Sequence, residues 1–132
     1  MPHSYNHKAF DVGRTSTSGL LSLYCSLVLI ELALKDRAAS WMRGHLLAQW
    51  LTNEADAGLT SLTLQLSSNL AQMKCTDRSG GSSGINLDAY PDIRYFRHES
   101  DFPGETTDAQ LKLCLELVRD IETVLQGKGI LQ

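Results

Sequence analysis

Hydrophobic positions recur at helical spacing in four stretches of the chain. The most apolar is residues 20–34, where LLSLYCSLVLIELAL is interrupted only by Ser22, Ser26 and Glu31. A helix that is apolar nearly all round is expected at the centre of a bundle. Because a bilayer span needs roughly 20 apolar residues, we expect this helix to be buried in protein rather than in a membrane.

Three further stretches carry a narrower apolar stripe on one helix face. Residues 40–55 are the second predicted helix, the third follows Gly58, and the fourth opens with a possible capping box at Thr107–Gln110 and stops at Gly127. Their stripes are Trp41, His45, Leu47 or Ala48, and Leu51; Leu59, Leu62, Leu66, Leu70 and Met73; and Leu111, Cys114, Leu115, Val118, Ile121 and Leu125. No segment alternates with the period of a strand, so we predict an all-α fold, an up-and-down bundle of four main helices.

One long irregular segment, residues 76–105, is predicted before the last helix. Its first half contains SGGSSG, and we expect residues 76–86 to be flexible, as we do residues 1–15. Its second half contains YPDIRYFRH, residues 90–98, whose three aromatic side chains can anchor it to the bundle. Residues 1–132 are then a single domain.

Composition narrows the class of protein. The 132 residues are 42% hydrophobic and 20% charged, as in an ordinary globular domain. The three cysteines form no CxxC pair and the start of the chain lacks a signal peptide, so we expect reduced thiols and a cytoplasmic location. A net charge of -3 argues against a broad basic surface for duplex DNA, although a local basic pocket remains compatible with it.

The candidate chemistry lies at Arg94, Arg97 and His98. Metal-independent RNA cleavage needs a group that moves the 2′-hydroxyl proton near neutral pH, and a cation for the phosphate; histidine and arginine supply these. If the segment is helical, Arg94 and His98 share a face. The alternative is that Arg94 braces the loop through Asp92 or Glu99.

Other candidates have simpler explanations. His45 follows Gly44 near a helix start, where a packing or capping role competes with ligand binding. Lys35 is expected at the solvated end of the central helix. His3 and His7 have helical spacing but no third ligand, so we predict no metal site. With no phosphate-binding glycine loop, we also predict no cofactor.

Four motifs together resemble the HEPN superfamily, in particular its nucleotide-binding, partner-linked members. They are Glu31-Leu32-Ala33-Leu34-Lys35, Gly44-His45-Leu46-Leu47, Tyr90-Pro91-Asp92-Ile93-Arg94-Tyr95, and Thr107-Asp108-Ala109. The resemblance implies a helical module that acts with a nucleotide- or RNA-processing partner in a prokaryotic toxin–antitoxin or antiviral defence system. The ligand-binding residues would be Arg94, Tyr95, Arg97, Lys35 and His45.

An enzyme remains the alternative. The ribonuclease branch of the family has an arginine and a histidine separated by four to six residues, whereas Arg94 and His98 are separated by three. This spacing favours the binding module over an endoribonuclease with Arg94 and His98 at a dimer interface. A helical scaffold without a ligand is the third reading. Because Leu113, Leu117 and Val124 widen the apolar stripe of the last helix, we expect a homo-oligomer or a protein partner.

Overall fold

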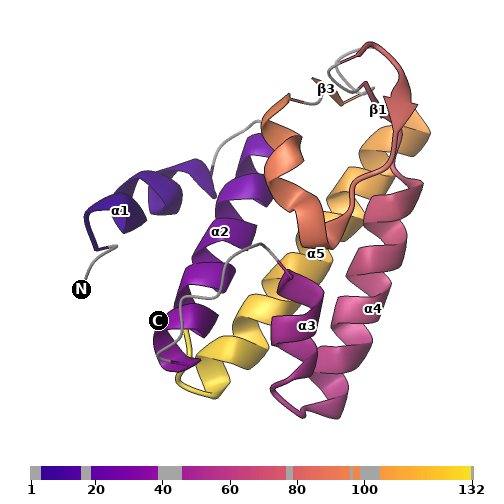
Figure 1. Ribbon diagram of the computed structural model, residues 1–132. Helices are drawn as coiled ribbons and strands as arrows, with labels where there is room; N and C mark the ends of the chain where they lie inside the picture. The colour runs from indigo at the N-terminus through magenta and orange to yellow at the C-terminus, as the bar shows by residue number, and fades with distance from the viewer. Residues whose placement is uncertain are drawn as a thin grey trace.

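The computed structural model describes residues 4–15, 19–38, 46–76, 79–95, 97–98 and 105–131, and most of these are helical (Figure 1). Within them, the side chains of residues 4–8, 38, 97–98 and 105–108 are not described. The elements in chain order are α1 (Ser4–Gly13), α2 (Gly19–Ala38), α3 (Leu47–Thr52), α4 (Ala57–Gln72), β1 (Cys75–Thr76), β2 (Ser82–Ser83), the 3-10 helix η1 (Leu87–Tyr95), β3 (Arg97–His98) and α5 (Glu105–Gly127).

Helix α2 is the centre of the fold. It contacts α1, α3, η1 and α5, and its Leu23, Leu27, Ile30 and Leu34 are at most 1% exposed. The burial predicted for residues 20–34 is therefore confirmed. Within the described ranges, no helix has both the length and the apolar character needed to cross a membrane.

Helices α4 and α5 pack side by side, α5 also packs against α2, and both helices carry the predicted stripes (Figure 1). Helix α4 begins where Asp56 Oδ1 accepts a hydrogen bond from the Leu59 amide at 2.9 Å, a side-chain N-cap. This bond holds the pKa of Asp56 below its ordinary value. Helix α5 begins at Glu105, so Thr107 lies inside the helix and the predicted capping box is wrong.

The second predicted helix is described only in part. Within residues 46–55, Leu47–Thr52 forms helix α3 and the flanking residues are not helical, while residues 39–45, which include Trp41 and His45, lie outside the described residues. The start of α3 is set by a residue distant in sequence, because Asp88 Oδ1 accepts a hydrogen bond from the Ala48 amide at 2.9 Å. Local periodicity contains no information about such a contact.

Two further elements were not predicted. Helix α1 occupies part of the segment expected to be flexible, and it packs on α2 through Phe10, whose ring centroid lies 6.4 Å from that of Tyr24. A small antiparallel sheet has the strand order β2-β1-β3. Each strand has two residues, too few to produce an alternating pattern. The helical class is confirmed, but the count of four main helices is not.

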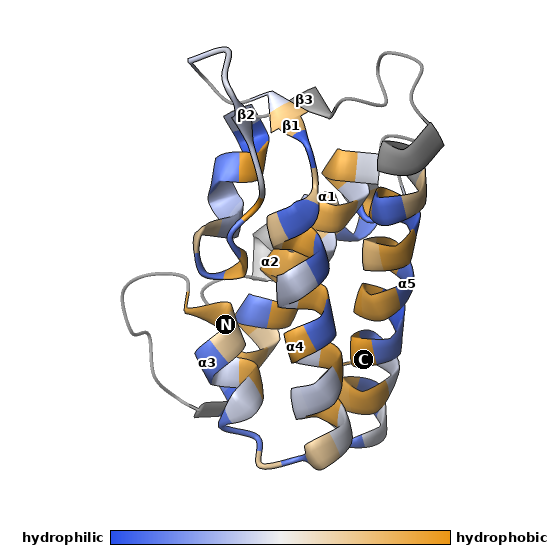
Figure 2. Ribbon diagram, turned by 90° about the vertical axis from the view of Figure 1, so that its right-hand side faces the viewer, coloured by the Kyte–Doolittle hydropathy of each residue, from blue (hydrophilic) through white to orange (hydrophobic). Residues whose placement is uncertain are grey.

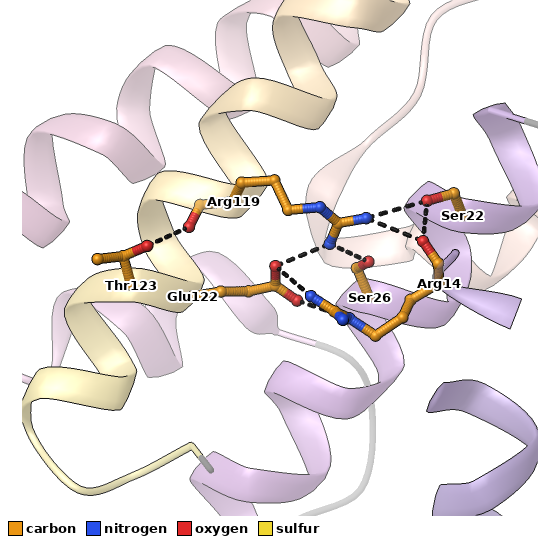
Figure 3. A network of polar contacts seen from close by, with 6 residues as sticks. All are labelled: Arg14, Ser22, Ser26, Arg119, Glu122 and Thr123. Carbon is orange, nitrogen blue, oxygen red and sulfur yellow. Dashed lines mark hydrogen bonds and ion pairs between the residues drawn. The ribbon is translucent and has the colours of Figure 1, made fainter. Parts of the chain in front are cut away.

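A polar network ties α1, α2 and α5 together, and we call it the Arg–Glu clasp (Figure 3). Arg14 Nε and Nη2 donate to the two carboxylate oxygens of Glu122 at 3.3 and 3.0 Å. Arg119 Nη1 donates to Glu122 Oε1 at 2.7 Å and to Ser26 Oγ at 2.9 Å. Arg119 Nη2 donates to the Arg14 carbonyl at 2.9 Å and to Ser22 Oγ at 3.1 Å. The clasp therefore fixes the end of α1 to the bundle.

The apolar residues of α5 that were expected to form an oligomer or partner interface are mostly covered by the domain itself. Leu117 is 5% exposed and Val124 packs against the core, while Leu113 is 41% exposed. A single half-exposed leucine is ordinary on a monomer surface. The prediction of an oligomer or a partner remains, but the α5 stripe no longer supports it.

Candidate functional site

The 3-10 helix η1 is the platform of the candidate site. Its Leu87, Tyr90 and Ile93 are buried in the core, and its chain direction changes at Ala89, whose φ of -132° and ψ of 32° interrupt the helix. The buried side chains hold η1 to the core, and the hydrogen bond between Asp88 and the Ala48 amide holds η1 to α3. Residues at the end of η1 are therefore presented from a rigid base.

Arg94 and Tyr95 form an exposed pair at the end of η1. The guanidinium carbon of Arg94 lies 5.2 Å from the centroid of the Tyr95 ring, within cation–π distance, and Tyr95 is 47% exposed. Arg94 Nε donates to the Pro91 carbonyl at 3.0 Å. Within the described part of the chain, no carboxylate forms an ion pair with Arg94. Arg94 is an exposed residue, so its guanidinium group reaches solvent.

The bracing interaction suggested by the sequence takes a different form. Arg94 bonds to a backbone carbonyl three residues earlier rather than to Asp92, and Glu99 lies outside the described residues. A single backbone bond through Nε holds the stem of the side chain. An ion pair with Asp92 would instead engage the forked end of the guanidinium group, and none occurs among the described residues.

A buried polar cluster of Glu31, Lys35 and Tyr90 joins η1 to α2. Lys35 Nζ lies 3.5 Å from Glu31 Oε2, and both residues are at most 7% exposed. Tyr90, 1% exposed, is hydrogen-bonded to Glu31, and its ring centroid lies 6.0 Å from that of Tyr24. Burial raises the pKa of Tyr90, the Glu31 carboxylate raises it further, and the charge of Arg94 opposes them. Tyr90 is therefore a protonated hydroxyl.

The position of Lys35 overturns one expectation. The sequence placed it at a solvated helix end, and that is wrong, because Lys35 packs into the domain beside Glu31 one helical turn earlier. A buried amine next to a carboxylate serves first to balance the charge of that carboxylate. Its predicted ligand-binding role stays a prediction, since any ligand would have to reach an amine on a residue that is only 7% exposed.

Arg94 and His98 do not lie on one helix. Arg94 lies in the last turn of η1, whereas His98 lies in β3. There His98 is the register partner of Cys75, as Arg97 is of Thr76. The predicted shared face is therefore wrong, because the chain leaves the 3-10 helix and joins a sheet. The side chains of Arg97 and His98, and the whole of His45, lie outside what is described.

The two arginines of the Arg–Glu clasp were not predicted from the sequence. Arg14 and Glu122 are 108 residues apart, and nothing local connects them. Only Arg119 and Glu122, three residues apart on α5, carry a sequence signal of an ion pair. The two arginine side chains are 30% and 38% exposed, but their donors are directed at Glu122, two serines and a backbone carbonyl.

All three cysteines are buried, and none of them forms a disulfide bond. Cys114 Sγ lies 3.7 Å from Met73 Sδ, and burial, followed by the neighbouring Cys75, raises the pKa of Cys114 to about 12. A thiol with this pKa is a poor nucleophile. Among the described residues, no group of three or more histidine, cysteine, aspartate or glutamate side chains is arranged to hold a metal ion.

Comparison with known proteins gives no match: no protein-family model, curated protein sequence or solved structure matches the chain.

Proposed function

We propose that the protein is a HEPN-like helical binding module that recognises single-stranded RNA or a nucleotide through Arg94 and Tyr95. The observation that carries the proposal is the exposed pair itself, an arginine stacked on a tyrosine at the end of a buried 3-10 helix. The HEPN assignment rests on the four sequence motifs. The helical fold is compatible with it.

The chemistry of the pair suits a ligand that has both a base and a phosphate. Aromatic rings and guanidinium planes stack on unpaired bases, which duplex nucleic acid does not offer. The guanidinium fork of Arg94 donates two parallel hydrogen bonds to a phosphate. Because the net charge of the chain is -3, a nucleic-acid ligand is bound by local contacts rather than by a general electrostatic field.

The remaining predicted ligand residues have different parts in this proposal. Arg97 follows η1 closely in sequence and adds a second cation on β3. Lys35 acts indirectly, because it balances the charge of Glu31, which in turn holds Tyr90 and so positions η1. His45 lies outside the described residues, so its predicted part in ligand binding stays a prediction from the sequence.

The first experiment compares two arginines of similar exposure. Arg94→Ala removes the proposed contact, whereas Arg37→Ala, the control, removes an exposed arginine that already pairs with Glu54. Binding of a fluorescein-labelled single-stranded oligoribonucleotide is measured by fluorescence anisotropy. Loss of a charge-assisted contact costs about 1.5–3 kcal/mol, so we expect roughly ten- to hundredfold weaker binding for Arg94→Ala and no change for the control.

Two results would contradict the proposal. One is a wild-type protein that binds neither the oligoribonucleotide nor nucleoside triphosphates at any concentration tested. The other is an Arg94→Ala protein whose thermal midpoint collapses, since Arg94 would then be a structural residue. Tyr95→Ala and Tyr95→Phe separate ring stacking from hydroxyl bonding, and we expect only the alanine variant to lose binding.

The partner belongs to the same proposal. We infer that the module works with a nucleotide- or RNA-processing protein in a prokaryotic defence or toxin–antitoxin type system, as the motif resemblance implies. Untargeted mass spectrometry of the affinity-purified protein, with and without Arg94→Ala, tests this. The proposal predicts a co-purifying nucleotide or RNA that the variant loses and a nucleic-acid-processing protein in the wild-type sample.

A further inference from the structure

Helix α1 is attached to the bundle by few side chains. None of the described core residues belongs to α1, and Phe10 packs against the core while it stays partly exposed. Ala9, Asp11 and Val12 are exposed. The helix packs mainly on α2 and lies at the left-hand edge of the bundle in Figure 1, with α4 at the right-hand edge. An element with few buried apolar contacts opens at a lower free energy than the core of its domain.

The helix is also too short to persist without its contacts. It spans ten residues, Ser4–Gly13, whereas isolated helices of fewer than about 12–15 residues are marginal in water. The contacts with α2 and α5 therefore maintain both the position of α1 and its helical structure. When these contacts are lost, we expect α1 to unfold as a unit while the rest of the domain stays folded. The element thus has two discrete states, docked and released.

Two attachments meet at the C-terminal end of α1. Arg14, the next residue, forms the ion pair with Glu122 at 3.0 Å, and its carbonyl accepts the hydrogen bond from Arg119 (Figure 3). One residue earlier, the backbone of Gly13 lies directly on Cys25, because a Cβ at this position would be 2.3 Å from Cys25 Sγ. Cys25 is 4% exposed. Part of the cover of this thiol is therefore α1 itself.

A row of three aromatic rings leads from α1 through α2 to η1. The ring centroid of Tyr24 lies 6.4 Å from that of Phe10 and 6.0 Å from that of Tyr90. Tyr24 is only partly buried, whereas Tyr90 is 1% exposed and lies in η1, one turn before Arg94. Release of α1 removes Phe10, so Tyr24 gains rotational freedom and packs less firmly against Tyr90. Because coupling is carried by packed side chains that have two arrangements, the row links the state of α1 to the platform that presents Arg94.

We propose that α1 is a latch that regulates the site formed by Arg94 and Tyr95. In the docked state, α1 fixes Tyr24 and thereby holds η1 in the position that binds single-stranded RNA or a nucleotide. In the released state, η1 loosens and the affinity for that ligand falls. The regulatory part rests on the proposed function, whereas the two states of α1 do not. Because coupling between two sites is reciprocal, a ligand at Arg94 and Tyr95 also keeps α1 docked.

The three cysteines report the release of α1 in one experiment. Cys25 lies under α1, whereas Cys75 and Cys114 are 0% exposed and belong to the continuous core. The folded protein is treated with N-ethylmaleimide in urea below the unfolding transition, and labelling of each cysteine is followed by peptide mass spectrometry. Cys25 should react at least about tenfold faster than the other two, and with a weaker urea dependence, since release of α1 exposes less surface than global unfolding.

Arg14→Ala tests the contact that holds the latch closed. The variant removes the ion pair between Arg14 and Glu122 but keeps the other ion pair of the clasp. Loss of a charge-assisted contact that water partly screens should speed the labelling of Cys25 about tenfold. Arg37→Ala is the matched control, because it removes an exposed arginine from a different ion pair, and it should leave the labelling rate of Cys25 unchanged.

Leu66→Val separates the release of α1 from global unfolding. Leu66 is 0% exposed on α4, which lies at the front of the bundle in Figure 2, on the side away from α1. The variant destabilises the docked and released states equally relative to the unfolded chain. Labelling of Cys114 in urea should therefore be faster than in the wild type, and labelling of Cys25 should be unchanged. A Cys25 that reacts no faster than Cys114, or that accelerates with it in Leu66→Val, would overturn the latch.

Hydrogen exchange tests the coupling to η1 without any ligand. In Arg14→Ala, the amides of residues 93–95 should exchange about fivefold faster or more than in the wild type, whereas Arg37→Ala should leave their exchange unchanged. An Arg14→Ala protein in which Cys25 reacts faster, but in which these amides exchange at the wild-type rate, would overturn the regulation of the site.

A fluorescein-labelled single-stranded oligoribonucleotide tests the same coupling from the site. At a concentration that saturates the anisotropy signal, it should slow the labelling of Cys25 about fivefold or more in the wild type and not in Arg94→Ala. Bound RNA that leaves Cys25 unprotected would overturn the regulation but not the proposed function. If no RNA binds, the proposed function fails, and the exchange of η1 in Arg14→Ala alone decides whether α1 controls this element.

Discussion

The Arg–Glu clasp offers the sharpest test of what holds α1 to the bundle. Glu122 is 3% exposed and is the counter-charge of both Arg14 and Arg119. Glu122→Ala leaves the two guanidinium groups side by side without it. Removing one partner of a fully buried ion pair costs about 3–5 kcal/mol. Because the Arg14 and Arg119 side chains are 30% and 38% exposed, water screens part of this cost, and we expect about 2–3 kcal/mol.

The assay is urea unfolding followed by circular dichroism, with a thermal melt beside it. For a domain of this size, 2–3 kcal/mol corresponds to a fall in thermal midpoint of roughly 10 °C. Glu122→Gln retains one acceptor oxygen but no charge, and we expect it to lose about half as much as the alanine variant. Glu116→Ala, at an exposed position of the same helix, is the control and should change stability by less than about 0.5 kcal/mol. A Glu122→Ala protein within 0.5 kcal/mol of the wild type would refute the electrostatic argument.

Three further outcomes follow from local geometry. Gly84→Ala should destabilise the domain by about 2–3 kcal/mol in urea unfolding, since its Cβ would lie 2.1 Å from a backbone oxygen of α4, whereas Gly127→Ala, which meets nothing within 4 Å, should be neutral. Because the pKa of Cys114 is raised to about 12, iodoacetamide at pH 8 should label it only in denaturant, as read by mass spectrometry; labelling of the folded protein would contradict its burial. The pKa of Asp56 is lowered from 3.8, so its N-cap stabilises α4 fully above about pH 4 and is lost as pH falls through the lower native pKa. Asp56→Asn should remove that part of the acid dependence of the thermal midpoint, and an unchanged pH profile would count against the cap.

Sequence pattern predicted the elements that bury a continuous apolar stripe. Helices α2, α4 and α5 are of this kind, and the spacing of their apolar residues predicts which of those residues are buried. The same pattern did not predict elements whose ends or packing depend on contacts between residues distant in sequence. The start of α3 is bonded to Asp88, forty residues away, and α1 is held by the contact of Phe10 with Tyr24 and by the distant partners of Arg14.

The candidate site also has a part that the sequence predicts and a part that it does not. An aromatic and basic segment anchored on the bundle was predictable, and η1 has buried anchors as expected. The placement of its cations was not. Whether Lys35 faces water depends on which elements cover α2, and whether Arg94 and His98 share a face depends on a change from 3-10 helix to strand between them. Neither is determined by spacing within the segment.

The most direct test of the proposed function is an amide chemical-shift titration of the isotope-labelled protein with a short single-stranded oligoribonucleotide. The account predicts that the largest shifts cluster at the end of η1, around Arg94 and Tyr95, and that they vanish in the Arg94→Ala protein while its other resonances remain in place. Shifts confined to the Arg–Glu clasp or to the face of α4, or no shifts at millimolar ligand, would contradict it.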